Sequence, residues 1–270
     1  MWLRLRFDTD GADSATHTPL GSTFGEESGM TVRPADLNKA IAWLFIIGSA
    51  LFMLGSVPAY VNAVGGIADS VTYFAGSIFF TVASFAQLVQ AQTPAMTAVD
   101  ADSQYTRAPV RWWALLPHDR NWLAAITQFP GTLCFNVSTL AALAHNATAE
   151  QEDRRVWRPD LYGSTLFLVA SVFAILAVGR FLSFQPRSHL WRIAWLNMIG
   201  SILFMISALA SYVLPTTDEL INSPVSIAGT LLGALYFLIG AILMFPAWTH
   251  AVRAAQPSRP EDPQNRRRSQ

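Results

Sequence analysis

Six stretches of the chain are almost entirely apolar, and the segments between them carry nearly all of the charged residues. A helix of roughly 20 residues crosses a hydrocarbon core about 30 Å thick, and each stretch reaches that length. The pattern therefore predicts an all-α, polytopic integral membrane protein. Its six transmembrane helices are expected at residues 40–61, 67–90, 122–144, 161–180, 191–214 and 225–248.

The third stretch is the most polar of the six. It contains Gln128, Asn136 and the pair Pro130-Gly131. A proline inside a span removes one backbone hydrogen bond and bends the helix, which is tolerated where neighbouring helices cover the break. We retain this stretch as a span, because the distribution of basic residues described next is consistent only with six spans.

Lysines and arginines are distributed unequally between the two sides that six spans define. Fifteen lie in the N-terminal tail, the second and fourth loops and the C-terminal tail, and three lie in the third loop, at Arg154, Arg155 and Arg158. Cytoplasmic segments of membrane proteins are enriched in these residues. Both termini are therefore expected in the cytoplasm.

The two ends of the chain have the composition of disordered tails. Residues 1–38 combine acidic residues with Gly, Ser and Thr, and residues 251–270 are rich in proline and arginine. Neither contains the apolar run of a signal peptide or a packed domain. The predicted organisation is a cytoplasmic tail over residues 1–38, a six-helix membrane domain over 39–250 and a basic cytoplasmic tail over 251–270.

Composition supports the membrane assignment and excludes several other classes. Hydrophobic residues make up 52% of the 270 residues, charged residues only 13%, and the formal net charge is zero. A soluble globule of this size could not cover so much apolar surface, and no basic excess exists to bind nucleic acid. The single cysteine, Cys134, rules out an intramolecular disulfide. Seventeen arginines against one lysine favour a bacterial source, and hence the inner membrane.

Two of the predicted spans are similar in sequence. Residues 41–61 and 193–213 are identical at twelve of twenty-one aligned positions without a gap. The shared positions include two tryptophans, Trp43 and Trp195, which composition alone does not explain. Internal similarity of this kind indicates duplication. We expect three helical hairpins, formed by spans one and two, three and four, and five and six.

A motif of two small residues, two variable residues, Phe, two variable residues and two small residues recurs along the spans. Glycine, phenylalanine and the next small residue then share one helix face, where small residues allow close backbone approach in lipid. The alternative is that these stripes line a substrate path. The predicted packing residues are Gly48, Phe52, Gly76, Phe80, Gly131, Phe135, Gly163, Phe167, Gly200, Phe204 and, with Met244 in place of Phe, Gly240.

The strings GSALF at residues 48–52 and GSILF at 200–204 lie within tryptophan-bearing apolar helices. In this respect the chain resembles the YrhK-like membrane domain of bacterial proteins. The resemblance covers only the helical repeats and implies a small helical membrane domain. It carries over no catalytic or binding residue, and six spans exceed the single hairpin of the smallest members.

Candidate chemistry within the spans is limited to uncharged polar residues. Gln128 and Asn136, together with Asn197, either line a small polar cavity or form hydrogen bonds between helices. Histidines fall near span ends, and the sequence contains no hydrolase, metalloprotease or nucleotide-binding motif. We therefore expect no cofactor, no metal and no catalysis.

Two functional hypotheses follow. The first is a non-enzymatic inner-membrane protein with a structural or assembly role, whose partners are lipid and other membrane proteins or further copies of itself. The second is a small-molecule permease or channel with a polar cavity near the third span.

Overall fold

The computed structural model describes residues 4–5, 30–93, 96, 98–99, 105–144, 148–179, 184–214, 217 and 219–255. Its helices are α1 (Pro34–Gly55), α2 (Pro58–Val64), α3 (Gly66–Gln92), α5 (Arg120–Ala141), α6 (Ala149–Glu152), the π-helix η1 (Asp153–Trp157), α7 (Arg158–Val178), α8 (His189–Ala210), α9 (Ser223–Ile242) and α10 (Met244–Ala255). Its strands, of two residues each, are β1 (Arg4–Leu5), β2 (Thr31–Val32), β3 (Ala98–Val99), β4 (Ala108–Pro109), β5 (Val213–Leu214) and β6 (Glu219–Leu220).

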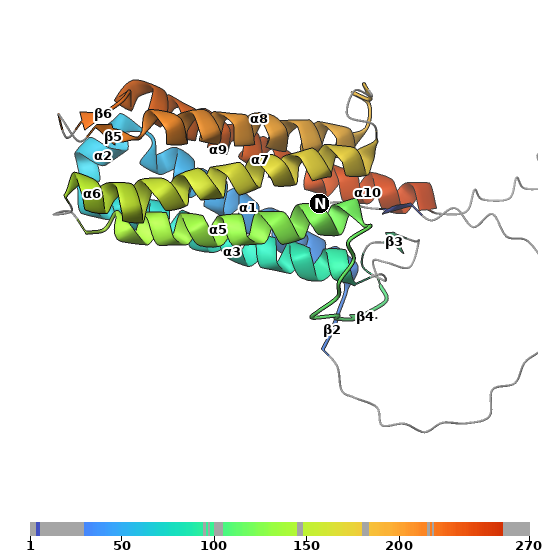
Figure 1. Ribbon diagram of the computed structural model, residues 1–270. Coiled ribbons are helices and arrows are strands. Elements are labelled where there is room, and N and C mark those ends of the chain that lie inside the picture. The colour runs from blue at the N-terminus through green and yellow to red at the C-terminus, as the bar shows by residue number, and fades with distance from the viewer. Residues whose placement is uncertain are drawn as a thin grey trace, which may run out of the picture.

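Six long helices form a closed ring. Each packs against its neighbour in chain order, from α1 to α3, α5, α7, α8 and α9, and α9 packs against α1. The most extensive contacts join α1 with α3, α5 with α7, and α8 with α9. Figure 1 shows these helices running side by side, with α2, α6 and the β5–β6 pair at one end and α10 at the other. We call these the distal and the proximal end.

Five of the long helical segments are long and apolar enough to cross a membrane. They are Pro34–Gly55, Gly66–Gln92, Glu150–Val178, His189–Ala210 and Ser223–Ala255. Helix α5 is as long as α1 and continues through Pro130, but it is not among the five. The described chain is therefore all-helical in class, with five candidate membrane spans and one more polar long helix in the same ring.

The start of the bundle differs from the prediction. Helix α1 begins at Pro34, so the expected tail over residues 1–38 is wrong for its last residues, while most of that tail lies outside the described residues. Helix α1 also ends at Gly55, where a single span to residue 61 was expected. Pro58 opens the separate helix α2, and a proline disfavours the helical conformation of the residue before it. Gly65, with φ +83°, then joins α2 to α3.

The fourth predicted span starts too late in the sequence. The helical segment begins at Ala149 and passes through η1 into α7, so Asp160 lies within a helix. Pro159 has no N–H and would clash with the carbonyl four residues before it, which the wider π-helix relieves. The Arg158 N–H accordingly bonds to the carbonyl of Asp153, five residues back. Trp157 then donates its indole N–H to the Ala208 carbonyl, 2.8 Å away.

The C-terminal end is also more ordered than predicted. The tail expected from residue 251 is wrong for its first five residues, because α10 continues to Ala255; residues 256–270 lie outside the described part. Met244, Ala247, Trp248 and Val252 are buried at helical spacing against the main core. This apolar face holds α10 to the bundle.

Close helix contacts recur at glycines in the three most extensively packed pairs. A Cβ atom added at Gly48 would lie 3.1 Å from the Gly76 carbonyl oxygen, and one at Gly163 would lie 3.0 Å from that of Gly131. One at Gly200 would lie 3.1 Å from the carbonyl oxygen of Gly233. Five of the six predicted glycines, all but Gly240, therefore lie where backbones meet, and a side chain there would collide with a carbonyl that cannot rotate away.

The motif in the last helix has a different register from the one expected. Gly233 faces Gly200, and a Cβ atom added at Gly233 would lie 2.6 Å from Cδ1 of Phe204. Phe237 follows at the usual spacing, so the motif runs from Gly233 and does not start at Gly240. Gly240 instead makes room for a polar side chain, because a Cβ atom there would lie 2.9 Å from Oδ1 of Asn197.

Six buried phenylalanines, one from each long helix, fill the centre of the ring. Within pairs the ring centroids of Phe52 and Phe80 are 5.5 Å apart, and those of Phe135 and Phe167 are 5.1 Å apart. Contacts between pairs include Phe167 with Phe237 at 5.7 Å. We call this set the phenylalanine layer: Phe52, Phe80, Phe135, Phe167, Phe204 and Phe237.

Candidate functional site

Two cavities lie on the axis of the ring, on opposite sides of the phenylalanine layer. Phe52, Phe135 and Phe204 line the distal cavity, and Phe237 lines the proximal one. The layer therefore separates the two spaces. Edge-to-face packing of the rings, such as the 88° between Phe52 and Phe80, is a favourable aromatic arrangement. A polar solute moving along the axis would have to displace these rings.

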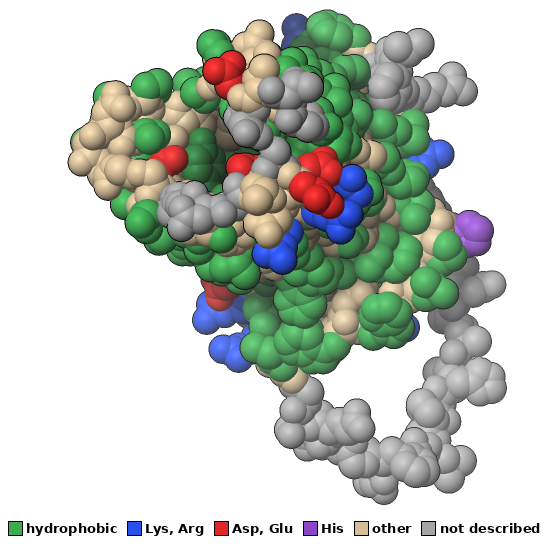
Figure 2. Space-filling model, turned by 60° about the vertical axis from the view of Figure 1, so that its left-hand side comes forward, with side chains coloured by type: hydrophobic (Ala, Val, Ile, Leu, Met, Phe, Trp, Pro, Cys, Tyr) green, Lys and Arg blue, Asp and Glu red, His purple; other side chains and the backbone are tan. Residues whose placement is uncertain are grey.

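The distal cavity has a volume of about 110 Å³ and a polar wall. Figure 2 turns the distal end forward and shows a hollow on that face with acidic side chains beside it. All six long helices contribute to the wall, which places the cavity on the axis. Besides the three phenylalanines, it is lined by Tyr73, Thr139, Asp160, Ser164, Ser207 and Thr230.

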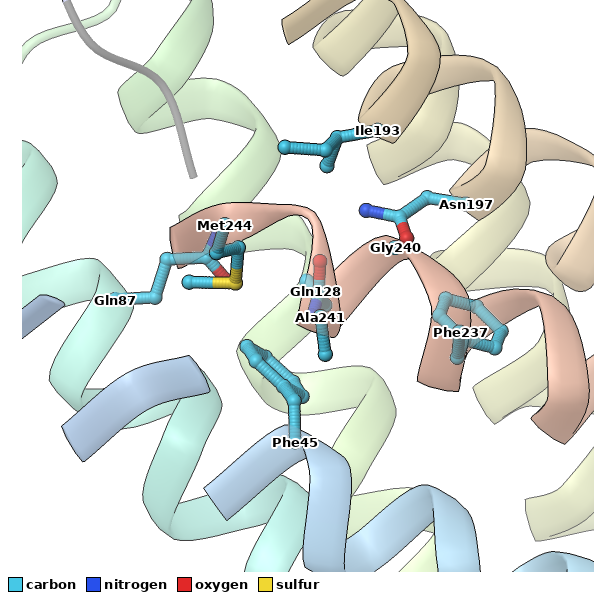
Figure 3. A pocket seen from close by; sticks show the side chains of 9 residues that line it. All are labelled: Phe45, Gln87, Gln128, Ile193, Asn197, Phe237, Gly240, Ala241 and Met244. Atoms are coloured by element: carbon cyan, nitrogen blue, oxygen red, sulfur yellow. The ribbon is translucent and has the colours of Figure 1, made fainter. Parts of the chain in front are cut away.

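The proximal cavity is smaller, about 20 Å³, which is enough for one water molecule. Figure 3 shows Gln87 and Asn197 pointing into it from different helices. Gln128 also lines it, and Oε1 of Gln87 is buried without a hydrogen-bond partner. Three amides around so small a space suit one bound water, which would satisfy the Gln87 oxygen.

The structure brings together two of the three residues predicted to line a polar cavity. Gln128 and Asn197 line the proximal cavity, on α5 and α8, and Gln87 of α3 joins them. Asn136 lines neither of the two cavities; its Oδ1 is buried without a hydrogen-bond partner. The two glutamines and Asn197 lie on the proximal side of the phenylalanine layer, whereas Asn136 follows Phe135 on the other side of it.

Sequence reasoning missed Asp160, the acidic residue of the distal cavity. It precedes the predicted fourth span by one residue and so falls in the predicted third loop, with Arg154, Arg155 and Arg158. A signal was available in the motif itself, because Asp160 lies three residues before Gly163 and so on the same helix face. Its neighbour Arg158 contacts Asp153 instead, with Nη2 2.7 Å from Oδ2.

Histidines come together at the proximal end. The rings of His189 and His250 lie with centroids 4.7 Å apart, and Nη2 of Arg192 is 3.2 Å from Nδ1 of His189. A structural zinc site needs four protein ligands and a catalytic one three. The part of the chain that the structure describes holds no group of three or more His, Cys, Asp or Glu side chains placed to bind a metal.

Comparison with known proteins adds no relative. No protein-family model, no curated protein sequence and no solved structure matches the chain. The resemblance to the YrhK-like family therefore stays a prediction, and the function is argued from the geometry of the bundle and its two axial cavities.

Proposed function

We propose that this chain is a six-span protein of the bacterial inner membrane with both termini in the cytoplasm, built as three repeated hairpins. The position of helix α5 supports its assignment as the sixth span, because it lies in the ring between α3 and α7, two of the five apolar helices. Its Gln128 lines the proximal cavity, whereas Leu133, Val137 and Leu140 are exposed. A polar side chain toward the bundle interior and exposed apolar side chains suit a helix that contacts lipid.

Within that membrane, the protein acts without catalysis, as a structural or assembly component. The phenylalanine layer is the observation that carries this proposal. All six rings are at most 7% exposed, so the centre of the bundle is a packed core and not an open passage. A bundle closed in this way presents its outer surface to lipid and to other membrane proteins, which suits a scaffold.

Co-purification tests the assembly role. The full chain, tagged and expressed at its native level, would be extracted in a lipid-retaining polymer, and the bound membrane proteins quantified. A partner recovered in fixed ratio to the chain is the expected result. If the chain migrates as a lone monomer with lipid only, the assembly role is wrong.

A small-molecule permease is the second candidate, and one observation favours it: polar cavities lie on both sides of the phenylalanine layer. Stopped-flow light scattering on proteoliposomes distinguishes it from the first. We expect glycerol and urea to enter liposomes containing the chain no faster than empty ones. A faster entry that Phe80→Trp abolishes would establish the permease instead, because the larger ring would block the same layer.

A further inference from the structure

Three equivalent positions, one from each helix pair, line the distal cavity, and one of them holds a carboxyl group. Tyr73, Asp160 and Thr230 each lie three residues before the glycine of their helix contact, at Gly76, Gly163 and Gly233. All three side chains line the cavity. Asp160 thus takes the place that uncharged hydroxyl groups take in the other two helix pairs.

The hydroxyl groups of Tyr73 and Thr230 form hydrogen bonds with the partner segment of their own helix pair, and the Asp160 carboxylate does not. The Tyr73 hydroxyl lies 2.8 Å from Oγ of Ser56, and Oγ1 of Thr230 lies 2.7 Å from Oγ of Ser207. In the Asp160 pair, the serine equivalent to Ser207 is Ser138, which donates to the Val156 carbonyl at 2.8 Å. Among the described residues, no hydrogen bond or ion pair engages the Asp160 carboxylate.

Capping of a helix end does not explain the carboxylate either. Helix α7 continues directly from η1, so its first N–H groups already bond to carbonyls of the preceding turn. The side chain before α7 forms no capping bond. A carboxylate at membrane depth is expensive unless it is paired or used, and this one faces a cavity.

The hydroxyls around Asp160 present lone pairs to the cavity and few protons. Ser56 donates to the Phe52 carbonyl at 2.8 Å, so Tyr73 is the donor in its bond to Ser56. Thr139 donates to the Phe135 carbonyl at 2.7 Å. The hydroxyl protons of Ser207 and Thr230 are used in bonds between these two residues and to the Ser226 carbonyl, which lies 2.7 Å from Oγ of Ser207 and 3.2 Å from Oγ1 of Thr230.

The lining is therefore rich in acceptors and holds one carboxyl group, which supplies a negative charge when it is ionised. An ammonium group has three donors and no acceptor, and so complements it. The floor of the cavity consists of the aromatic rings of Phe52, Phe135 and Phe204, which attract a cation over their faces and accept an alkyl group. The volume of about 110 Å³ exceeds that of a single water and suits a molecule of a few non-hydrogen atoms.

We propose that the distal cavity is a binding site for a small organic cation that carries a primary ammonium group. The ammonium group pairs with the Asp160 carboxylate and donates to the hydroxyl oxygens of Thr139 and Thr230, and the alkyl part lies on the phenylalanine floor. The unbonded Ser164 hydroxyl, one turn along α7 from Asp160, completes the polar side. The site does not depend on the scaffold role proposed above.

Thermal unfolding of the full chain in detergent tests the site, with ethylammonium chloride as the probe. At roughly five times its Kd, the probe should raise Tm by about 2–4 °C. Sodium chloride and potassium chloride at the same ionic strength should not, and neither should ethanol, which lacks the charge. Equal shifts with the alkali salts would show an unspecific salt effect and overturn the proposal.

Matched variants locate the effect. Asp160→Asn keeps the shape but removes the charge, so the ethylammonium shift should vanish. Glu150→Gln makes the same change on an exposed residue at the same end and should keep the full shift. Ser164→Val leaves Asp160 in place but narrows the cavity, and should weaken the shift even if Asp160→Asn fails to fold. A shift unchanged in Ser164→Val or Asp160→Asn would mean that the cation binds elsewhere.

Discussion

At the scale of single residues, glycine contacts and phenylalanine rings hold the bundle together. Hydrogen bonds between hydroxyl groups also join neighbouring helix pairs. Oγ of Ser77 lies 2.9 Å from Oγ1 of Thr139, and Oγ of Ser171 lies 2.9 Å from Oγ of Ser201. Each bond of this kind contributes about 1 kcal/mol in a membrane. The larger contribution comes from close packing, because lipid supplies little hydrophobic force between helices.

Gly200→Leu should destabilise the folded protein by about 1–3 kcal/mol, the usual cost of overpacking. A Cβ atom there would lie 2.9 Å from Cδ2 of Phe237 as well as against the Gly233 backbone. Ile202→Leu changes an exposed position on the same helix and should be nearly neutral. Thermal unfolding in detergent compares the two; equal melting temperatures would show that the contact at Gly200 is not close.

Phe204→Ala should cost about 3–5 kcal/mol, because it opens a cavity in the phenylalanine layer. The Phe204 ring is 6% exposed, with its centroid 5.3 Å from that of Phe237 and 6.0 Å from that of Phe52. Phe184→Ala is the control, since that ring is 79% exposed and should lose little. Denaturant titration of both variants in mixed micelles measures the difference. A loss no greater than that of the control would contradict a packed centre.

At the scale of elements, the ends of helices are set by local hydrogen bonds that the sequence partly reveals. Asp119 caps α5, accepting from the backbone N–H of Asn121 at 2.8 Å and of Trp122 at 3.2 Å. Ser188 and Asn222 cap α8 and α9 in the same way. Since α5 is the least apolar helix of the ring, its cap matters most for holding it in place.

Asp119→Ala should therefore lower the free energy of unfolding by about 0.5–2 kcal/mol. Asp119→Asn preserves a cap and loses only the attraction of a negative charge for the helix N-terminus, about 0.3–1 kcal/mol. Hydrogen exchange at the first turn of α5 provides the local measurement. Faster exchange is expected in Asp119→Ala alone, and the same increase in both variants would assign the effect to charge.

At the scale of the whole molecule, the start of α1 and the whole of α10 lie at the same, proximal end of the ring. The proposed six-span topology agrees with this, because an even number of crossings brings both termini to one side. If that side is the cytoplasm, as proposed, the distal cavity faces the opposite side of the membrane.

Labelling of single cysteines in intact cells tests this topology. In a Cys134→Ser background, cysteines at Ser14, Ser223 and Ser269 would be exposed in turn to a thiol reagent that cannot cross the membrane. Ser223 begins α9 at the distal end, so only the cysteine there should react. Five crossings would place the termini on opposite sides, and labelling at Ser14 or Ser269 would reveal it.

Some features of this protein follow from the sequence alone. Long apolar stretches indicate helices in a membrane because the hydrocarbon core leaves backbone groups no other way to be satisfied. The glycine and phenylalanine stripes are also local, since their spacing depends only on the helical period. For that reason residues such as Gly48 and Phe52 could be placed on one face, and Gln128 and Asn197 could be paired in advance.

Other features were decided by the tertiary structure. The register in α9 is not one of them, because Gly233 with Phe237 matches the motif and Gly240, which has Met244 four residues later, does not. Asp160 looked like a loop residue because its place in the cavity requires the π-helix and the ring of six helices around it. Both the closed phenylalanine layer and the charged cavity arise from contacts between segments far apart in the chain, and no local period encodes those contacts.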